Sequence, residues 1–453
     1  MKKLVLLWAA VIGVACGEVK NAQPDAAIDA GIDAPPDAPP GPVLVTVLSS
    51  TGNGAPDVTA RVVFQDPQGA LVLDAMVDAM GKAQALLPSG GAVTVVRVVS
   101  NTPTTHNAIL TTITGVKPGD DLVIGLKRRA VTADEGGATQ MNVSYTTVAG
   151  ATYYQFFYAC GNGGIVQTAP PNVLAFRDSC HGASFDLLAT AQGGTIVPPR
   201  FTYLSGVTHT SGGSFTMPFG FTPMTTFTVN ATNTPAEVTS ISSSRWSLIE
   251  NSVAARQNGS VSGDPPAGAV AMTMPYAQGV GTSSQVEVTF TRPGVTMQHQ
   301  VRTATLASSI SIDLGEYELP VLTGQGVTRT GATWTAMTPG DAPDGQVLLW
   351  SADWTVGAQA RSVNWDVIGP ASLTGQPLPR LAAVLAEYDP AAQTVAVRVK
   401  TAVLYMANYD VVAGYDGFRQ MAETLVLPQF EDMGAFVGMP HQRRYMTLIL
   451  PAM

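Results

Sequence analysis

The sequence predicts an all-β protein: a disordered tether followed by tandem β-sandwich domains. Short runs rich in Val, Thr and aromatic residues recur along the chain, and turn residues separate them, with 45 Gly and 32 Pro among 453 residues. Runs of this kind that alternate with period 2 are typical of half-buried strands. Only 13% of the residues are charged and 45% are hydrophobic. A chain of this length and composition is expected to build several cores.

The first sixteen residues have the pattern of an export signal. Lys2 and Lys3 precede the apolar stretch Leu4–Val14, and small residues follow. This predicts a signal peptide over residues 1–15, too short to span a bilayer. Cys16 comes directly after the small residues, and the arrangement resembles the lipobox of bacterial lipoproteins, although Gly13 stands where that family prefers Leu. The resemblance implies that Cys16 is acylated and begins the mature chain. The alternative is a plain signal peptide in which Cys16 has no role.

The resemblance also implies a location and a membrane contact. Gly17 follows the anchor, in place of the Asp that commonly retains such lipoproteins in the inner membrane. We therefore expect a protein held at the outer membrane through lipid on Cys16, either periplasmic or exposed at the surface. A lipoprotein Cys carries more than one acyl chain, which anchors stably.

Residues 16–42 are expected to form the tether. Asp recurs every fourth residue, at Asp25, Asp29, Asp33 and Asp37, and Pro pairs follow the last two. Like charges at this spacing disfavour a helix, and the Pro pairs exclude one. The segment would reach on the order of 80 Å as polyproline II and nearer about 30 Å as a flexible coil. Its expected role is spacing.

The charge balance excludes one class of partner. The net charge is −9, and the Lys and Arg residues are scattered instead of clustered. Nucleic-acid binding needs a basic stripe that follows the phosphates, so we expect no nucleic acid partner.

Two cysteines remain if Cys16 carries lipid. Cys160 and Cys180 form an even pair in an oxidising compartment, which favours a disulfide. A metal site is the alternative, but only His181 lies near them, and this falls short of the usual four ligands.

Residues 43–130 are expected to form the first β-sandwich. Its short β-rich runs are separated by turn sequences such as Asp66-Pro-Gln-Gly69 and Lys117-Pro-Gly-Asp120. The sequence Asp78–Ala83, then Leu86–Gly90 and Val93–Val95, resembles the core signature of carboxypeptidase-regulatory-like (transthyretin-like) domains. The resemblance covers about a fifth of the chain. It implies a seven-stranded sandwich that displays or spaces its neighbours and has no catalytic activity.

Three further β domains are expected after it. The run Val148–Tyr154 resembles strands of fibronectin-type or immunoglobulin-like domains, which implies sandwiches of that type. Residues 131–235 carry the aromatic run Tyr153–Cys160 and the predicted disulfide, residues 236–330 form another sandwich, and residues 331–453 form a C-terminal β domain with one short helix. The helix is predicted over Pro379–Tyr388, where Leu381, Val384, Leu385 and Tyr388 recur at helical spacing. A single strand is predicted over Val327–Thr335.

No motif for catalysis, cofactor or metal binding stands out. The chain lacks His-Glu-x-x-His, Gly-x-Ser-x-Gly and a phosphate-binding Gly-rich loop, and its five His are dispersed. We expect each His in a loop or at the surface. Acidic pairs at Glu316/Glu318 and Glu431/Asp432, and the loops Asp341–Gly345 and Asp410–Gly417, are interpreted as solvated edges and ordinary turns in preference to glycosidase or calcium sites. A triad assembled by folding remains the alternative, because triads do not follow sequence order.

Aromatic residues supply the one cluster in the sequence that suggests a binding surface. Trp350 and Trp354 share a face of an extended strand because its side chains alternate. They could stack on sugar rings, or they could fill a sandwich core, which is the favoured interpretation. Tyr415 and Phe418 form a second candidate for binding, in a loop over Tyr409–Phe418 that is expected to be exposed.

The sequence thus favours a cell-envelope lipoprotein without catalytic activity that binds a glycan or an envelope protein, or acts structurally. The alternative is a secreted hydrolase that acts on an envelope or extracellular polymer.

Overall fold

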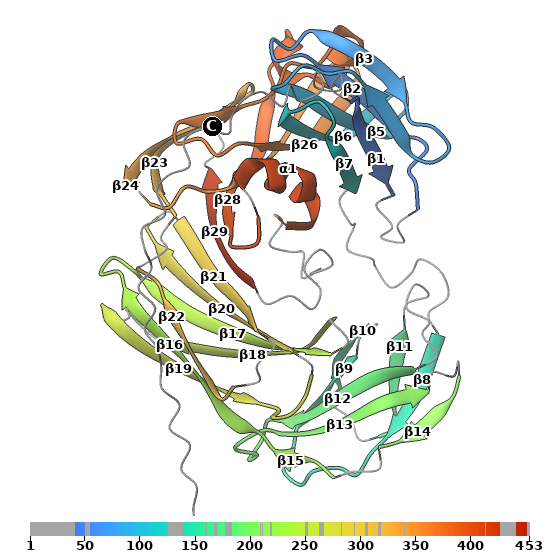
Figure 1. Ribbon diagram of the computed structural model, residues 1–453. Coiled ribbons are helices and arrows are strands. Elements are labelled where there is room, and N and C mark those ends of the chain that lie inside the picture. The colour runs from blue at the N-terminus through green and yellow to red at the C-terminus, as the bar shows by residue number, and fades with distance from the viewer. Residues whose placement is uncertain are drawn as a thin grey trace, which may run out of the picture. The chain divides into compact units, whose positions relative to one another are not determined.

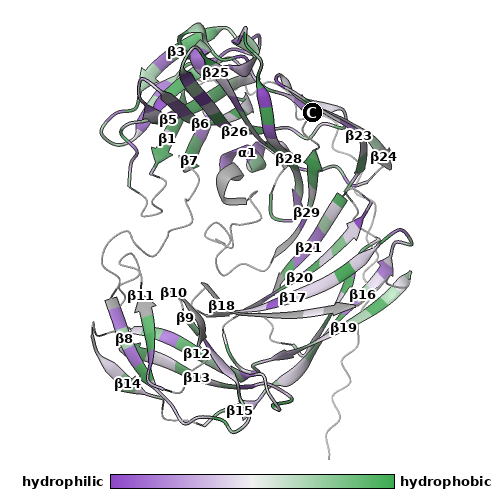
Figure 2. Ribbon diagram, turned by 180° about the vertical axis from the view of Figure 1, so that it is seen from behind, coloured by the Kyte–Doolittle hydropathy of each residue, from purple (hydrophilic) through white to green (hydrophobic). Residues whose placement is uncertain are grey.

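The structure is a computed structural model that describes residues 41–49, 55–125, 139–158, 161–166, 170–176, 184–208, 210, 212–217, 220–249, 252–261, 267–281, 283–293, 295–303, 307–315, 319–338, 340–412, 414–425 and 441–450 (Figure 1). It is predominantly β, as predicted, with six sheets among these residues. Hydrophobic and hydrophilic residues are interspersed along the strands (Figure 2). Gly41–Met453 form one compact unit.

The first seven strands form two layers. One is a three-stranded sheet in the order β4-β1-β7, and the other is one end of a twelve-stranded sheet. Alternate residues of β1, Val43, Val45 and Val47, are buried against Phe64 and Val93 of the facing layer. The strands are β1 (Val43–Leu48), β2 (Arg61–Gln65), β3 (Leu71–Met76), β4 (Lys82–Ala85), β5 (Gly91–Asn101), β6 (Thr105–Val116) and β7 (Asp121–Gly125).

The turns between these strands follow the expected chemistry. Gly69 and Gly119 have positive φ values of 81° and 84° in the two predicted turns. Gly81 has φ 72°, and a Cβ there would lie 2.5 Å from the carbonyl oxygen of Val47. Seven strands in two layers are the arrangement that the carboxypeptidase-regulatory-like resemblance implies. Membership of that family stays a prediction.

The next strands form a second pair of layers, with sheet orders β10-β9-β12-β13-β15 and β11-β8-β14. Tyr154, Phe156 and Tyr158 of the predicted aromatic strand are buried between them. The strands are β8 (Thr139–Ser144), β9 (Tyr153–Tyr158), β10 (Gly161–Val166), β11 (Asn172–Phe176), β12 (Ser184–Gln192), β13 (Arg200–Thr208), β14 (Ser214–Thr216) and β15 (Thr222–Pro223).

A third pair of layers follows. The sheet β19-β16-β22 packs on β17, β20 and β21 of the twelve-stranded sheet through the largest hydrophobic cluster, which includes Phe227, Tyr276 and Val288. The strands are β16 (Thr225–Thr234), β17 (Ser240–Ile249), β18 (Ser252–Val261), β19 (Gly268–Tyr276), β20 (Ser283–Arg292), β21 (Val295–Thr303) and β22 (Ser309–Asp313).

The remaining elements complete the twelve-stranded sheet and add the sheet β23-β24-β27. The long sheet runs β18-β17-β20-β21-β29-β28-β25-β26-β6-β5-β2-β3. The elements are β23 (Val321–Thr328), β24 (Gly331–Thr338), β25 (Gly345–Val356), β26 (Gln359–Gly369), β27 (Gly375–Pro377), the 3₁₀ helices η2 (Ala383–Tyr388) and η3 (Pro390–Ala392), β28 (Arg398–Tyr409), α1 (Gly414–Leu425) and β29 (His441–Leu450).

Strands from three of the predicted domain ranges, 43–130, 236–330 and 331–453, share this sheet. β26 pairs with β6 in parallel, from Ala360 opposite Thr105 to Ile368 opposite Ile113. The Trp365 Nε1 also donates a hydrogen bond to the Thr112 Oγ1 at 2.9 Å. Backbone pairing therefore crosses the boundary drawn at residue 130. The four ranges stay a prediction about chain segments.

Two local predictions are wrong. The strand predicted over Val327–Thr335 is a hairpin of β23 and β24, because Gly331 takes φ 140° at the turn. The helix predicted over Pro379–Tyr388 is the shorter 3₁₀ segment η2, whose Leu385 and Tyr388 are buried. The only α-helix among the described residues is α1.

Candidate functional site

The predicted tryptophan platform is part of a core. Trp350 is 1% exposed and Trp354 is 4% exposed, and both belong to the largest hydrophobic cluster. Trp350 lies directly opposite Trp365 of β26. Buried rings offer no surface for stacking on a sugar, so the core interpretation accounts for both residues and the binding interpretation is wrong.

Tyr415 and Phe418 lie on α1, which the sequence analysis missed. Phe418 is fully buried, and a Cβ at Gly345 would lie 2.3 Å from its Cδ1, so Gly345 makes room for the ring. The Tyr415 hydroxyl donates to the carbonyl of Thr114, and burial raises the pKa of Tyr415 above its usual value. These residues pack α1 against the rest of the fold and do not lie in an exposed loop. The spacing of Tyr415, Phe418, Arg419 and Ala422 at i, i+3, i+4 and i+7 was the available signal.

An ion cluster holds the same helix against the loop before β7, and Figure 1 shows α1 alongside β7. The Nε and Nη2 of Arg419 donate to the two carboxylate oxygens of Asp120 at 2.7 and 2.9 Å, and both residues are buried. Asp416 also pairs with Arg419 and with Lys117. Burial disfavours the charged guanidinium, but hydrogen bonds to Asp120 and Asp416 outweigh it and raise the pKa of Arg419. The cluster joins segments about 300 residues apart.

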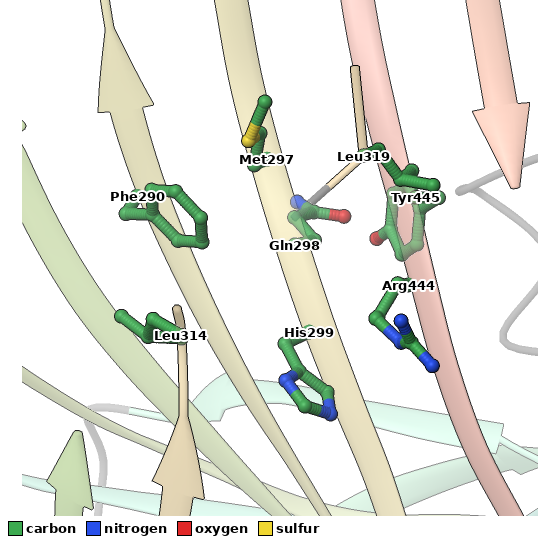
Figure 3. A pocket seen from close by; sticks show the side chains of 8 residues that line it. All are labelled: Phe290, Met297, Gln298, His299, Leu314, Leu319, Arg444 and Tyr445. Atoms are coloured by element: carbon green, nitrogen blue, oxygen red, sulfur yellow. The ribbon is translucent and has the colours of Figure 1, made fainter. Parts of the chain in front are cut away.

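A small pocket lies where β20, β21 and β29 run side by side (Figure 3). Its volume is about 270 Å³, including the part open to solvent. The described residues that line it are Phe290, Met297, Gln298, His299, Leu314, Leu319, Arg444 and Tyr445.

Sheet register explains which side chains meet there. His299 lies opposite Arg444, and Met297 lies one alternation along β21 on the same face. Phe290, Met297, Leu314 and Leu319 belong to the largest hydrophobic cluster, which sets the apolar character of the wall. Alternation turns Gln298 and Tyr445 to the other face, where Tyr445 packs in the cluster of the first sandwich.

The polar side of the pocket is formed by Arg444, which is ion-paired with Asp341, and by His299. The Arg444 Nη1 donates to the Asp341 Oδ2 at 2.6 Å, and Asp341 is about half exposed. His299 is 5% exposed, so the expectation that it lies in a loop or at the surface is wrong. No sequence signal links His299 with Arg444, because the pairing of β21 with β29 brings them together.

Asp341 and Asp344, in one of the loops considered for calcium, have partners within the protein. Asp341 binds Arg444, and the Asp344 Oδ2 accepts the N–H of Tyr409 at 2.7 Å. Burial raises the pKa of Asp344. Across the described ranges, no three His, Cys, Asp or Glu side chains gather in a group that could hold a metal ion. No helix in the same ranges is long and apolar enough to cross a bilayer.

Several predicted features lie outside the described residues: the signal peptide, Cys16, tether residues 17–40, Cys160, Cys180, Glu316/Glu318 and Glu431/Asp432. The lipid anchor and the disulfide therefore stay predictions.

Comparisons with known proteins show no family for this chain. No protein-family model matches it, and no curated protein matches it. Among solved structures it is similar to the Bacillus anthracis TIE protein, with 11% identity over 60% of this chain and 49% of that one and a TM-score of 0.15. It is also similar to a candidate adhesin from Bacteroides ovatus, with 7% identity over 44% of this chain and 100% of that one and a TM-score of 0.17. The chain thus spans about half the length of the TIE protein. At these TM-scores neither likeness carries an argument about fold or function.

Proposed function

We propose that the chain is a lipid-anchored protein of the bacterial outer membrane whose β-rich body is a non-catalytic binding module. The anchor is the acylated Cys16, and the acidic, Pro-rich residues 16–42 hold the body away from the bilayer. The observation that carries the binding role is the pocket formed by Phe290, Met297, His299 and Arg444. Apolar walls with a few convergent polar groups are the usual composition of a ligand site.

The lining supports binding over hydrolysis. Among the described residues that border the pocket there is no Ser, Cys, Asp or Glu. Covalent hydrolysis needs a nucleophile with a base, and glycoside hydrolysis needs two carboxylates. The polar groups among the described lining residues are the imidazole of His299, the guanidinium of Arg444, the amide of Gln298 and the hydroxyl of Tyr445.

The lining also favours a protein partner over a glycan. Four apolar side chains form the wall, and the tryptophans that could have stacked on sugars are buried. The pocket is small, because its volume of about 270 Å³ includes space open to solvent. Its apolar wall and its guanidinium suit an apolar group next to a carboxylate, which a guanidinium binds through charge-assisted hydrogen bonds. The terminal residue of an envelope protein or peptide has this chemistry.

N-acetyl-leucine tests this proposal, with N-acetyl-leucinamide as the probe that lacks the carboxylate. Methyl NMR on the folded chain, with the Met297 resonance assigned through Met297→Leu, is expected to show a saturable shift with the acid only. Arg444→Gln should weaken binding about tenfold or more, because a hydrogen bond to a charged group contributes about 1.5–3 kcal/mol. Arg398 does not line the pocket, so Arg398→Gln should leave binding unchanged.

Three results would overturn the ligand assignment: equal binding of acid and amide, a Met297 shift with neutral monosaccharides instead, or no shift with any of these probes.

A further inference from the structure

The guanidinium in the proposed ligand pocket already has an acidic partner. The Arg444 Nη1 donates to the Asp341 Oδ2 at 2.6 Å, and this ion pair offsets the charge of the guanidinium. A ligand carboxylate that binds Arg444 has to share it with the carboxylate of Asp341, which repels the ligand. A second positive charge in the lining would offset that repulsion.

His299 can supply this charge. Among the described lining residues, it is the only one besides Arg444 whose side chain can become a cation. It lies directly opposite Arg444 in the antiparallel pair of β21 and β29, and Figure 3 shows the two side chains on these adjacent strands. Directly opposite residues have Cα atoms about 4.5–5.5 Å apart, so both side chains can reach one carboxylate. An imidazole changes its charge between about pH 5 and pH 8.

Further charged groups on the described elements around His299 have partners of their own. These groups and partners are Asp344 with the N–H of Tyr409, Asp313 with the side-chain amide of Asn233, and Arg292 with Glu237. This leaves Arg444 and Asp341 as the charged groups of the described pocket that act on His299.

We infer that His299 binds the ligand carboxylate together with Arg444, and that each ligand is taken up with one proton on the imidazole. The coupling rests on the proposed function, because it needs a carboxylate ligand in the pocket. Without ligand, a proton on His299 sets a second cation opposite Arg444, and like charges directly opposite each other are destabilising. The ligand carboxylate offsets this repulsion, so ligand and proton each strengthen the binding of the other.

The affinity for N-acetyl-leucine at different pH values tests the coupling, with the Met297 methyl resonance as the readout. The carboxylate of this probe stays ionised throughout, because α-carboxyl groups titrate well below this range. Binding should be about tenfold tighter near pH 5.5 than near pH 7.5, because the imidazole changes from mostly protonated to mostly neutral over this range.

Two histidine variants identify the group that takes up the proton. His299→Gln should bind N-acetyl-leucine with the same affinity at both pH values, because it has no imidazole to protonate. His106→Gln is the matched control and should keep the pH dependence, since His106 lies beside Glu387 and does not line the pocket.

The imidazole resonances of the unsubstituted chain give a second readout that needs no variant. One of the five His should titrate at a higher pH when N-acetyl-leucine saturates the pocket, and the other four should not move.

The outcomes separate the coupling from the proposed function. Equal affinity at both pH values in the unsubstituted chain, or a pH dependence that persists in His299→Gln, would overturn the coupling and leave the ligand site in place. An unchanged titration of all five His at saturation would do the same. No binding at either pH would overturn the ligand site and the coupling together.

Discussion

Arg419→Ala is expected to lower the free energy of unfolding by about 3–5 kcal/mol, the cost of breaking a buried ion pair. The substitution leaves the carboxylate of Asp120 buried without the guanidinium that holds both of its oxygens. It also releases α1 from the loop that precedes β7, so the loss should reach both ends of the chain. Denaturant unfolding measures the change.

Two companion variants separate charge from packing. Replacing both partners, Arg419→Met with Asp120→Leu, should recover much of the loss, because an apolar pair of similar volume leaves no buried charge. Arg398→Ala removes a partner of Asp353, but Arg398 is 73% exposed, so the unfolding midpoint should not move measurably. Equal unfolding midpoints for Arg419→Ala and Arg398→Ala would contradict a stabilising role for the buried Arg419–Asp120 ion pair.

Trp350→Ala is expected to cost about 3–5 kcal/mol, the range for removing a large aromatic side chain from a core. The ring is fully buried against the face that also holds Trp365 and Leu348. The relevant measurement is again the unfolding midpoint. Ile449→Ala is the matched control, because Ile449 is exposed and its truncation should change the free energy by less than about 0.5 kcal/mol.

The Trp350 result also decides between the two interpretations of the tryptophan cluster. A Trp350→Ala chain that keeps the wild-type midpoint would show that the ring does not hold the fold together. The core assignment would then have to be withdrawn.

The sequence predicted the fold class because strand alternation and turn chemistry are local. Val43–Leu48 alternates as predicted, and Asp66–Gly69 and Lys117–Asp120 turn where Gly69 and Gly119 allow positive φ. The predicted Val327–Thr335 strand failed because a hairpin turn interrupts an otherwise strand-like run. The helix α1 was missed although its helical spacing was present in the sequence. Its stabilising contacts, from Arg419 to Asp120 and from Phe418 to the space beside Gly345, join segments far apart in the chain and have no local pattern.

Sequence patterns could not predict the pocket, because residues far apart in the chain form it. Its polar residues, His299 and Arg444, meet only because β21 and β29 pair, and its wall adds Leu314 and Leu319 from the connection between β22 and β23.

Acylation of Cys16 underlies the proposed location at the envelope, and intact mass spectrometry of the mature N-terminus tests it most directly, together with fractionation of a Cys16→Ser chain. We predict an N-terminus at residue 16 with the mass of a diacylglycerol and acyl adduct, and a Cys16→Ser chain that leaves the membrane fraction. An unmodified N-terminus, or a Cys16→Ser chain that stays fully membrane-bound, would contradict it.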